Sequence, residues 1–435
     1  MTIFINNENH QITNYMKRNS LFLATALLIS LAGCKSTPVQ DEPWISNALD
    51  VASFQLEKTA EELTGTNRIP RSIHSGYDMN FLDSQLQRED KSYIDSLLPN
   101  LSAKELQQRY ICGITDWTSG FFPGSLWYTY EMTGDEKLKN CAIQYTNMLN
   151  PIRRLKNTHD VGFMINCSYG NALRLAPNDT IKAVIIETAD NLSARFNPEI
   201  GCIRSWDFGE WNFPVIIDNM MNLDLLFNAT KLSGNPKYRD IAVKHAQTTM
   251  KNHFRPDYTS YHVVSYNNDG SVEKKETHQG KNDNSAWSRG QAWGVYGYTS
   301  CYRETEDTTF LREAINIADM IMKRVTTDDC IPYWDYDAPT GETTPRDASA
   351  AAITASALLE LSTFAPEGKK YFDYAETILK NLSSDKYLAA KGTNQGFVLM
   401  HSTGSLPHGS EIDVPLNYAD YYYLEALQRY RNLTK

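Results

Sequence analysis

The predicted fold depends on a stretch that recurs along the chain, and its first copy reads Thr133-Gly134-Asp135-Glu136-Lys137-Leu138, followed by Ala142. Each copy places a turn and an N-cap region ahead of an amphipathic helix with small residues on its packed face. The later copies occupy residues 233–238, 306–311 and 367–372, and they lead to Ala242, Ala314 and Ala375. We interpret the helices that follow as the outer members of helix pairs.

Segments of a different character alternate with these outer helices. They are rich in aromatic, small and amide residues, and a helix that is apolar nearly all round is a buried one. Six such segments occupy residues 125–132, 161–175, 219–232, 285–303, 348–364 and 418–431. The alternation predicts an all-α fold, an (α/α)6 toroid whose inner helices begin at one opening. Extended pieces at residues 201–206 and 258–266 are predicted to form short hairpins on its rim.

Composition limits the classes of protein to consider. The chain has 435 residues, of which 41% are hydrophobic and 11% aromatic, as expected for a globular protein. Because no Gly/Ser-rich or Pro-rich linker interrupts residues 44–435, we predict a single domain there. The net charge is 42 − 52 = −10 with no long Lys/Arg tract, which argues against nucleic acid as a partner. An acidic protein that binds an acidic sugar would need local basic groups.

Residues 1–34 are predicted to be an export signal rather than part of the fold. Met16-Lys17-Arg18 is a positive start, residues 21–31 are apolar but too short to span a bilayer, and residues 31–34 resemble a bacterial lipobox. Cys34 would then be the lipidated first residue of the mature chain, with residues 35–43 as a linker. Residues before Met16 fit no signal peptide and are expected to reflect an upstream start. The alternative is an uncleaved membrane anchor, and in either case the folded part lies in the periplasm or at a membrane surface.

The remaining cysteines do not indicate a metal site. Cys112, Cys141, Cys167, Cys202, Cys301 and Cys330 are scattered singly, without a CxxC pair or a His cluster at metal-ligand spacing. We therefore predict no metal and no cofactor. An exported protein could contain disulfides, which an even count cannot assign, but we expect mostly buried thiols.

Asp218 stands at the end of an apolar run, residues 213–217. An ionised carboxylate is costly to bury unless it is paired, so such a group becomes protonated, finds partners or takes part in chemistry. Asp is also favoured as a helix N-cap, and a helical pattern follows from Asn219. Capping and catalysis therefore both remain as interpretations of Asp218.

Other unusual residues also come just before predicted inner helices. Residues 116–124 precede the first, residues 158–163 the second, residues 285–293 the fourth and residues 346–350 the fifth. A toroid would bring all of them, with Asp218, to one cavity.

The residue types in these loops are those that bind sugars. Trp117, Trp206, Trp287 and Trp293 offer flat apolar faces, and Arg289 could bind a carboxylate bidentately. The alternatives are core packing for each Trp and a structural ion pair for Arg289. Similarly, His159 could orient its loop beside Asp160.

Five motifs in this order resemble those of glycoside hydrolase family 88, the unsaturated glucuronyl hydrolases, over roughly residues 45–433. They are Asp116-Trp117-Thr118-x-Gly-Phe-x-Pro-Gly, His159-Asp160-x-Gly-Phe, Ile217-Asp218-Asn219-Met220-Met221-Asn222, Ser285-Ala286-Trp287-x-Arg289-Gly290-Gln291-Ala292-Trp293 and Asp420-Tyr421-Tyr422-Tyr423-Leu424-Glu425-Ala426-Leu427. Each motif alone is a weak signal, whereas five in sequence are a strong one.

The resemblance implies the (α/α)6 fold and a substrate made by polysaccharide lyases, a di- to tetrasaccharide that ends in a 4,5-unsaturated uronic acid. The implied reaction hydrates the C4=C5 vinyl ether. A proton goes to C4, water adds at C5, and the resulting hemiketal opens to release the rest of the saccharide. Chondroitin, hyaluronan and heparin fragments all fit this description.

The resemblance also implies roles for individual residues. Asp218 matches the general acid and base, and Asp160 the second carboxylate that holds ring hydroxyls. The substrate-contacting set comprises Trp117, His159, Trp206, His262, Thr277, His278, Gln279, Trp287, Arg289 and Trp293.

Two other functions are compatible with parts of the pattern. A glycan-binding surface lipoprotein would keep the aromatic residues without turnover, although a binder gains nothing from an acid in an apolar run. A toroidal glycosidase acting on saturated or pectin-derived uronides would use Asp160 and Asp218 directly on the glycosidic bond.

Overall fold

The structure is a computed structural model that describes residues 41–73 and 109–435. These residues belong to one unit of the chain, residues 41–435. The predictions for the export signal, for Cys34 and for most of the linker fall outside the described residues and stay predictions. Among the helices of the described part, none has both the length and the hydropathy needed to cross a membrane.

Twelve helical segments of the described part alternate between an outer and an inner position along the chain. The outer ones are α2 (Pro43–Glu62), α7 (Glu136–Met148), α10 (Asp179–Ser193), α12 (Lys237–His253), α14 (Thr308–Arg324) and α16 (Gly368–Leu382). The inner ones are α6 (Phe121–Thr133), α8 (Val161–Ile165) continued by the π-helix η2 (Asn166–Gly170) and α9 (Asn171–Leu175), the 3₁₀-helix η3 (Ile217–Asn222) continued by α11 (Leu223–Ser233), α13 (Ser288–Thr305), α15 (Ala348–Leu361) and α17 (Asn417–Thr434).

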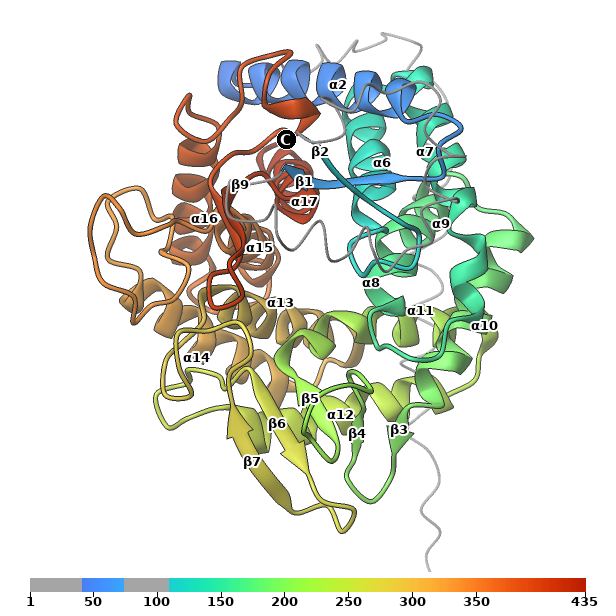
Figure 1. Cartoon of the computed structure of the whole chain (residues 1–435), viewed down its shortest axis with the longest axis vertical. Coiled ribbons are helices and arrows are strands. Elements are labelled where there is room, and N and C mark those ends of the chain that lie inside the picture. The colour runs from blue at the N-terminus through green and yellow to red at the C-terminus, as the bar shows by residue number, and fades with distance from the viewer. Residues whose placement is uncertain (1–40, 74–108) are drawn as a thin grey trace, which may run out of the picture. The chain divides into compact units, whose positions relative to one another are not determined.

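The inner helices close into a ring. Helix α6 packs on α17, α17 on α15, α15 on α13, α13 on η3 and α11, α8 on η3, and η2 back on α6. Figure 1 shows this ring in the centre, with α7, α10, α12, α14 and α16 around it. The predicted (α/α)6 toroid is therefore confirmed. All inner helices begin on the same side of the ring, which we call the entrance side.

The recurring stretch builds the junctions on the opposite side. Gly134 and Gly234 end inner helices in the left-handed conformation, with φ of 72° and 70°. One residue later, the Asp135 side chain accepts the backbone N–H of Lys137 and caps α7, and the Asn235 side chain accepts the backbone N–H of Lys237 at the start of α12. The alanines predicted to face inward, Ala142, Ala242, Ala314 and Ala375, are all fully buried. Helix ends and packed faces thus follow from the same pattern.

Short strands complete the rim. β1 (Ile69–Ile73) pairs with β2 (Arg109–Cys112), β3 (Phe196–Asn197) with β4 (Cys202–Ile203), and β8 (Ser402–Ser405) with β9 (Ser410–Val414). A three-stranded sheet joins β5 (Pro214–Ile216), β6 (Val263–Tyr266) and β7 (Val272–Glu276). A hairpin was predicted at residues 258–266; within it, β6 pairs with the following strand β7 and also with β5 from the apolar run before Asp218, so it is the middle strand of a sheet.

Glu425 of α17 ties four inner helices together inside the ring. Its carboxylate accepts hydrogen bonds from Tyr128 of α6 (2.7 Å), Tyr296 of α13 (3.0 Å) and Ser356 of α15 (2.6 Å). Buried polar groups need such partners, and here each partner comes from a different helix. The network therefore fixes the helices relative to one another.

Gly162 is the point of closest approach between two neighbouring inner helices. It belongs to α8 and lies against Asn222 of η3, whose Oδ1 accepts the backbone N–H of Phe163 at 2.8 Å. A Cβ on Gly162 would lie 2.6 Å from the Cα of Asn222. Only glycine fits this contact without a shift of the backbone.

We predict that Gly162→Ala lowers both stability and turnover. Overpacking of this kind lowers the free energy of unfolding by about 1–3 kcal/mol. The backbone shift would also move the helix starts that bear Asp160 and Asp218. The thermal midpoint and the initial rate would be measured together. The matched control is Gly294→Ala on α13, where a Cβ would make ordinary contacts of 3.4 Å and more. Equal behaviour of the two variants would contradict the special role of the Gly162 contact.

Candidate active site

Asp160 and Asp218 lie at the starts of two adjoining inner helices. Asp160 directly precedes α8, and Asp218 is the second residue of η3. The contact between Gly162 and Asn222 holds these two helix starts together, since it lies two residues after Asp160 and four after Asp218. The structure thus brings together the two carboxylates that the sequence singled out.

The Asp218 side chain is buried and incompletely paired. Its Oδ2 has no hydrogen-bond partner among the described residues. Burial raises the pKa of Asp218 from 3.8 to about 6, Asp160 acts in the same direction, and His159 and Arg289 oppose the change. The N-cap interpretation is wrong, because η3 already begins at Ile217 and places Asp218 inside its first turn. The apolar run before it continues as β5, which explains the burial.

Asp160 has the opposite electrostatic character. Its Oδ2 accepts a hydrogen bond from Thr158 Oγ1 at 2.7 Å, and its Oδ1 lies 3.2 Å from His159 Nε2. Burial alone would raise the pKa of Asp160, but His159, Thr158 and Arg195 outweigh it, so the pKa is lowered. Two carboxylates in one site thus have pKa values displaced in opposite directions.

His262 faces Asp218 as a neutral donor. Its Nε2 lies 3.6 Å from Asp218 Oδ2, because β5 and β6 pair just before Asp218 and just after His262. Its Nδ1 accepts the backbone N–H groups of His278 (3.2 Å) and Gln279 (3.1 Å), so the ring proton resides on Nε2. Burial lowers the pKa of His262 well below its usual value, so the pair is not an ion pair.

Arg289 is already engaged within the protein. Its Nη1 donates to Asp347 (3.0 Å) and to the carbonyl of Thr403 (2.6 Å), and its Nη2 donates to the carbonyl of Gly404 (2.6 Å). Gln279 Nε2 also donates to Gly404 at 3.1 Å. These contacts correspond to the structural ion pair considered from the sequence, and they attach strand β8 to the site.

The tryptophans chosen from the sequence differ in their surroundings. Trp287 stacks on His262 with ring centroids 4.5 Å apart, and the Arg289 guanidinium lies 4.5 Å from its ring. Trp117 is half-buried and contacts Phe163 and Tyr418. Trp293, in contrast, is fully buried between Phe163 and Tyr422, which is a core position. A sugar contact by any of them stays a prediction.

An aromatic cluster on the rim extends beyond the residues chosen from the sequence. Trp206 stacks on Phe208 with centroids 4.9 Å apart and contacts Trp211 and His278. Phe208 is 57% exposed, which is unusual for a large apolar side chain. The spacing Trp206-x-Phe208-x-x-Trp211 in an extended stretch was a signal for this cluster.

The β8–β9 hairpin adds a histidine that sequence reasoning missed. His408, at the hairpin tip, lies 4.5 Å from His278 between ring centroids. Thr277 orders the loop that contains His278, since its Oγ1 accepts the N–H of Gly280 at 2.8 Å. Nothing in the sequence linked His408 to His278, because the contact joins segments far apart in the chain.

This arrangement can perform acid–base chemistry. Near neutral pH one carboxyl group, Asp218, exchanges a proton readily while its neighbour Asp160 stays ionised. In the described part of the chain, no group of three or more His, Cys, Asp or Glu side chains could hold a metal ion.

Several known proteins resemble this chain in sequence and in fold. Residues 95–432 match the profile of Glycosyl Hydrolase Family 88, and residues 16–88 that of a domain of unknown function. An unsaturated glucuronyl hydrolase of Formosa agariphila is 49% identical over 323 residues, 73% of this chain and 80% of its own. A crystal structure of an unsaturated glucuronyl hydrolase specific for heparin is 48% identical with a TM-score of 0.81, covering 90% of this chain and 98% of its own. A mutant of the Streptococcus agalactiae enzyme complexed with dGlcA-GalNAc6S is 26% identical with a TM-score of 0.72, covering 89% and 92%.

We predict that Asp218→Asn becomes more stable relative to the wild type as pH rises from about 4 to about 6. The folded-state pKa lies above the unfolded one, so the folded protein binds the extra proton and loses that stabilisation as pH increases through about 6. Ionisation of the buried Asp218 destabilises the folded wild type by on the order of 3 kcal/mol, since one pKa unit is about 1.4 kcal/mol. The variant has no ionisable group there and avoids this loss. Thermal midpoints across this pH range would measure it.

Asp160→Asn is the matched control for this prediction. The pKa of Asp160 is lowered, so its ionised form stabilises the folded state above the usual Asp pKa, and the variant should lose stability there. If the stability of both variants relative to the wild type changed in the same direction with pH, the opposite pKa shifts of Asp160 and Asp218 would be contradicted.

Proposed function

The chain belongs to glycosyl hydrolase family 88 and is an unsaturated glucuronyl hydrolase, and we propose that Asp218 is the group that protonates its substrate. The substrates are unsaturated oligosaccharides of glycosaminoglycan type, made by polysaccharide lyases. Because the solved relative at 48% identity is specific for heparin, we propose heparin-derived disaccharides as the preferred ones. Export as a lipoprotein through Cys34 is proposed on the sequence alone.

The first proposed step transfers a proton from Asp218 to C4 of the terminal ring. The C4=C5 electron pair forms the new C–H bond, and positive charge develops at C5 and the ring oxygen. Asp218 becomes a carboxylate, which the Nε2–H of His262 faces at 3.6 Å. Asp160, already ionised, holds ring hydroxyls and favours the developing positive charge.

The second proposed step returns the proton. The Asp218 carboxylate removes a proton from water while the water oxygen bonds to C5. The product is a hemiketal, which opens by breaking its bond to the ring oxygen and then releases the remaining saccharide from C1. One carboxyl group therefore serves first as acid and then as base.

The observation that supports this role best is the state of Asp218. A group that both gives and takes a proton works best with a pKa near the working pH, and burial raises the pKa of Asp218 to about 6. An ordinary surface carboxyl would be almost wholly ionised there. The Asp218 Oδ2 that has no hydrogen-bond partner in the described part of the chain is the atom proposed to carry the proton.

Two other mechanisms predict different spectroscopic results. Hydration destroys the C4=C5 chromophore, so ultraviolet absorbance falls as product forms. A glycosidase that used Asp160 and Asp218 on the glycosidic bond would release sugars without that initial loss, and a binding protein would cause neither change.

We predict that Asp218→Asn lowers turnover of an unsaturated disaccharide by at least ~100-fold, because the amide cannot donate and retake the proton. Loss of ultraviolet absorbance would measure the rate, and calorimetry would measure binding, which should be retained. Disaccharides from heparin and from chondroitin would be assayed side by side.

Asp240→Asn is the control, since Asp240 is exposed on the outer helix α12. It makes the same chemical change far from the entrance side and should leave the rate close to that of the wild type. Near-normal turnover of Asp218→Asn would remove Asp218 from the mechanism.

We also predict that kcat/KM falls above about pH 6, approaching tenfold per pH unit, because Asp218 must be protonated to act as an acid. The acid limb should lie below the usual Asp pKa, since Asp160 must be ionised and its pKa is lowered. The profile would be recorded with the absorbance assay. A rate that stays constant from about pH 6 to 8 would be incompatible with this assignment.

A further inference from the structure

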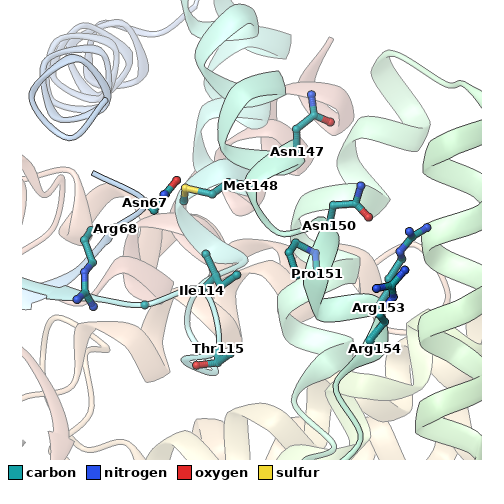
Figure 2. Close-up of a pocket in the computed structure, with 11 residues that line it drawn as sticks. Asn67, Arg68, Ile114, Thr115, Asn147, Met148, Asn150, Pro151, Arg153 and Arg154 are labelled. Carbon is teal, nitrogen blue, oxygen red and sulfur yellow. The ribbon is translucent and has the colours of Figure 1, made fainter. Parts of the chain in front are cut away.

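A basic cavity lies on the entrance side, and the carboxylate pair does not line it. Its volume is about 880 Å³, and its described lining comes from residues 67–68, residues 113–115, the end of α7 and residues 150–154. Figure 2 shows Asn67 and Arg68 on one side of this cavity and Asn150, Arg153 and Arg154 on the other. We call it the arginine pocket.

The arginine pocket is positively charged in a chain that is negative overall. Arg153 and Arg154 line it together with Arg68, which has a partner within the protein, and none of the lining residues in the described part of the chain is acidic. The whole sequence carries a net charge of −10, so an anion gains from meeting this local concentration of positive charge. Guanidinium groups bind sulfate and carboxylate with paired N–H donors.

Two of these arginines retain donors for a ligand. Arg154 is exposed and makes no ion pair within residues 41–73 and 109–435. Arg153 pairs with Glu187 at 3.3 Å, and both side chains of that pair are partly exposed to solvent. A pair of this kind is weak, so Arg153 can also contact an anion.

The remaining lining suits a sugar rather than a bare ion. Asn67, Asn147 and Asn150 provide amide groups for hydroxyls, and Asn150 Oδ1 is a buried acceptor without a partner among the described residues. Ile114 and Met148 add apolar surface for the C–H faces of a ring. The volume falls within the range of about 300–1,000 Å³ that is usual for small-ligand sites.

The arginine pocket is separate from the proposed reaction site. Asp160, Asp218 and His262 do not line it. The reacting sugar is the non-reducing end of its chain, so the rest of the saccharide leaves the reaction site only from C1. A ligand in the arginine pocket is therefore a second molecule, or the part of a longer saccharide on the C1 side of the reacting ring.

We propose that the arginine pocket is a second binding site for a sulfated or carboxylated saccharide. It would keep the enzyme close to polyanionic glycan while the carboxylate pair processes chain ends. The proposal relies on the enzyme's activity only for the choice of ligand, because binding there requires no turnover.

The test uses the full chain and a heparin-derived tetrasaccharide with a saturated non-reducing end, which is not a substrate. We expect Arg153→Gln/Arg154→Gln to raise the Kd about tenfold in calorimetry, since two charge-assisted contacts are lost. The single variant Arg154→Gln should show part of the effect, and its exposed position makes a folding defect improbable. A neutral tetrasaccharide should not bind measurably in the same experiment.

The control Arg312→Gln/Lys323→Gln removes the same charge from the exposed face of α14. It should leave the Kd unchanged. Neither double variant should alter turnover of an unsulfated disaccharide by more than about twofold, because the substituted residues are outside the carboxylate site. An unchanged Kd in Arg153→Gln/Arg154→Gln, or an equal rise in the control, would overturn the proposal. Competition by inorganic sulfate as strong as by the tetrasaccharide would overturn its saccharide part. A failure of the absorbance assay in the wild type would instead count against the catalytic proposal.

Discussion

The contact between Gly162 and Asn222 is the constraint on which the catalytic arrangement depends. It allows α8 and η3 to approach so closely that the Asn222 side chain accepts the N–H of Phe163 across the interface. The residues at the starts of these two helices then meet at one place. Inside the same ring, the Glu425 carboxylate accepts hydrogen bonds from hydroxyl groups of three other inner helices. The toroid therefore acts as a rigid frame that holds two carboxyl groups at fixed positions.

The two carboxyl groups differ because their surroundings differ. Asp160 sits in a polar loop with Thr158 and His159, whereas Asp218 follows the apolar strand β5 as the second residue of η3 and is buried. A neutral His262, with its proton fixed on Nε2 by two backbone donors, faces Asp218 without imposing a full charge. The site consequently combines one ionised carboxylate with one carboxyl that can lose and regain a proton near neutral pH. This division of roles is what hydration of a vinyl ether requires.

Much of the ring was predictable from local chemistry. The glycines that end α6 and α11, and the Asp that caps α7 one residue after Gly134, can be recognised in the sequence. The apolar run before Asp218 indicated its burial, whereas the N-cap role considered for it is wrong. The engagement of Arg289 with Asp347 and the β8 carbonyls, and the approach of His408 to His278, were not predictable, because they join segments brought together only by the closed ring. Such long-range contacts leave no periodic signal in one sequence.

The proposed chemistry depends on the protonation state of Asp218, which infrared difference spectroscopy can measure. Asp420 and Glu313 are also buried carboxyls with pKa values raised to about 7, so the wild type must be compared with Asp218→Asn. We expect a protonated-carboxyl band that titrates with a pKa of about 6 and is missing from Asp218→Asn but present in Asp160→Asn. A band that persists in Asp218→Asn, or one that disappears only in Asp160→Asn, would contradict this expectation.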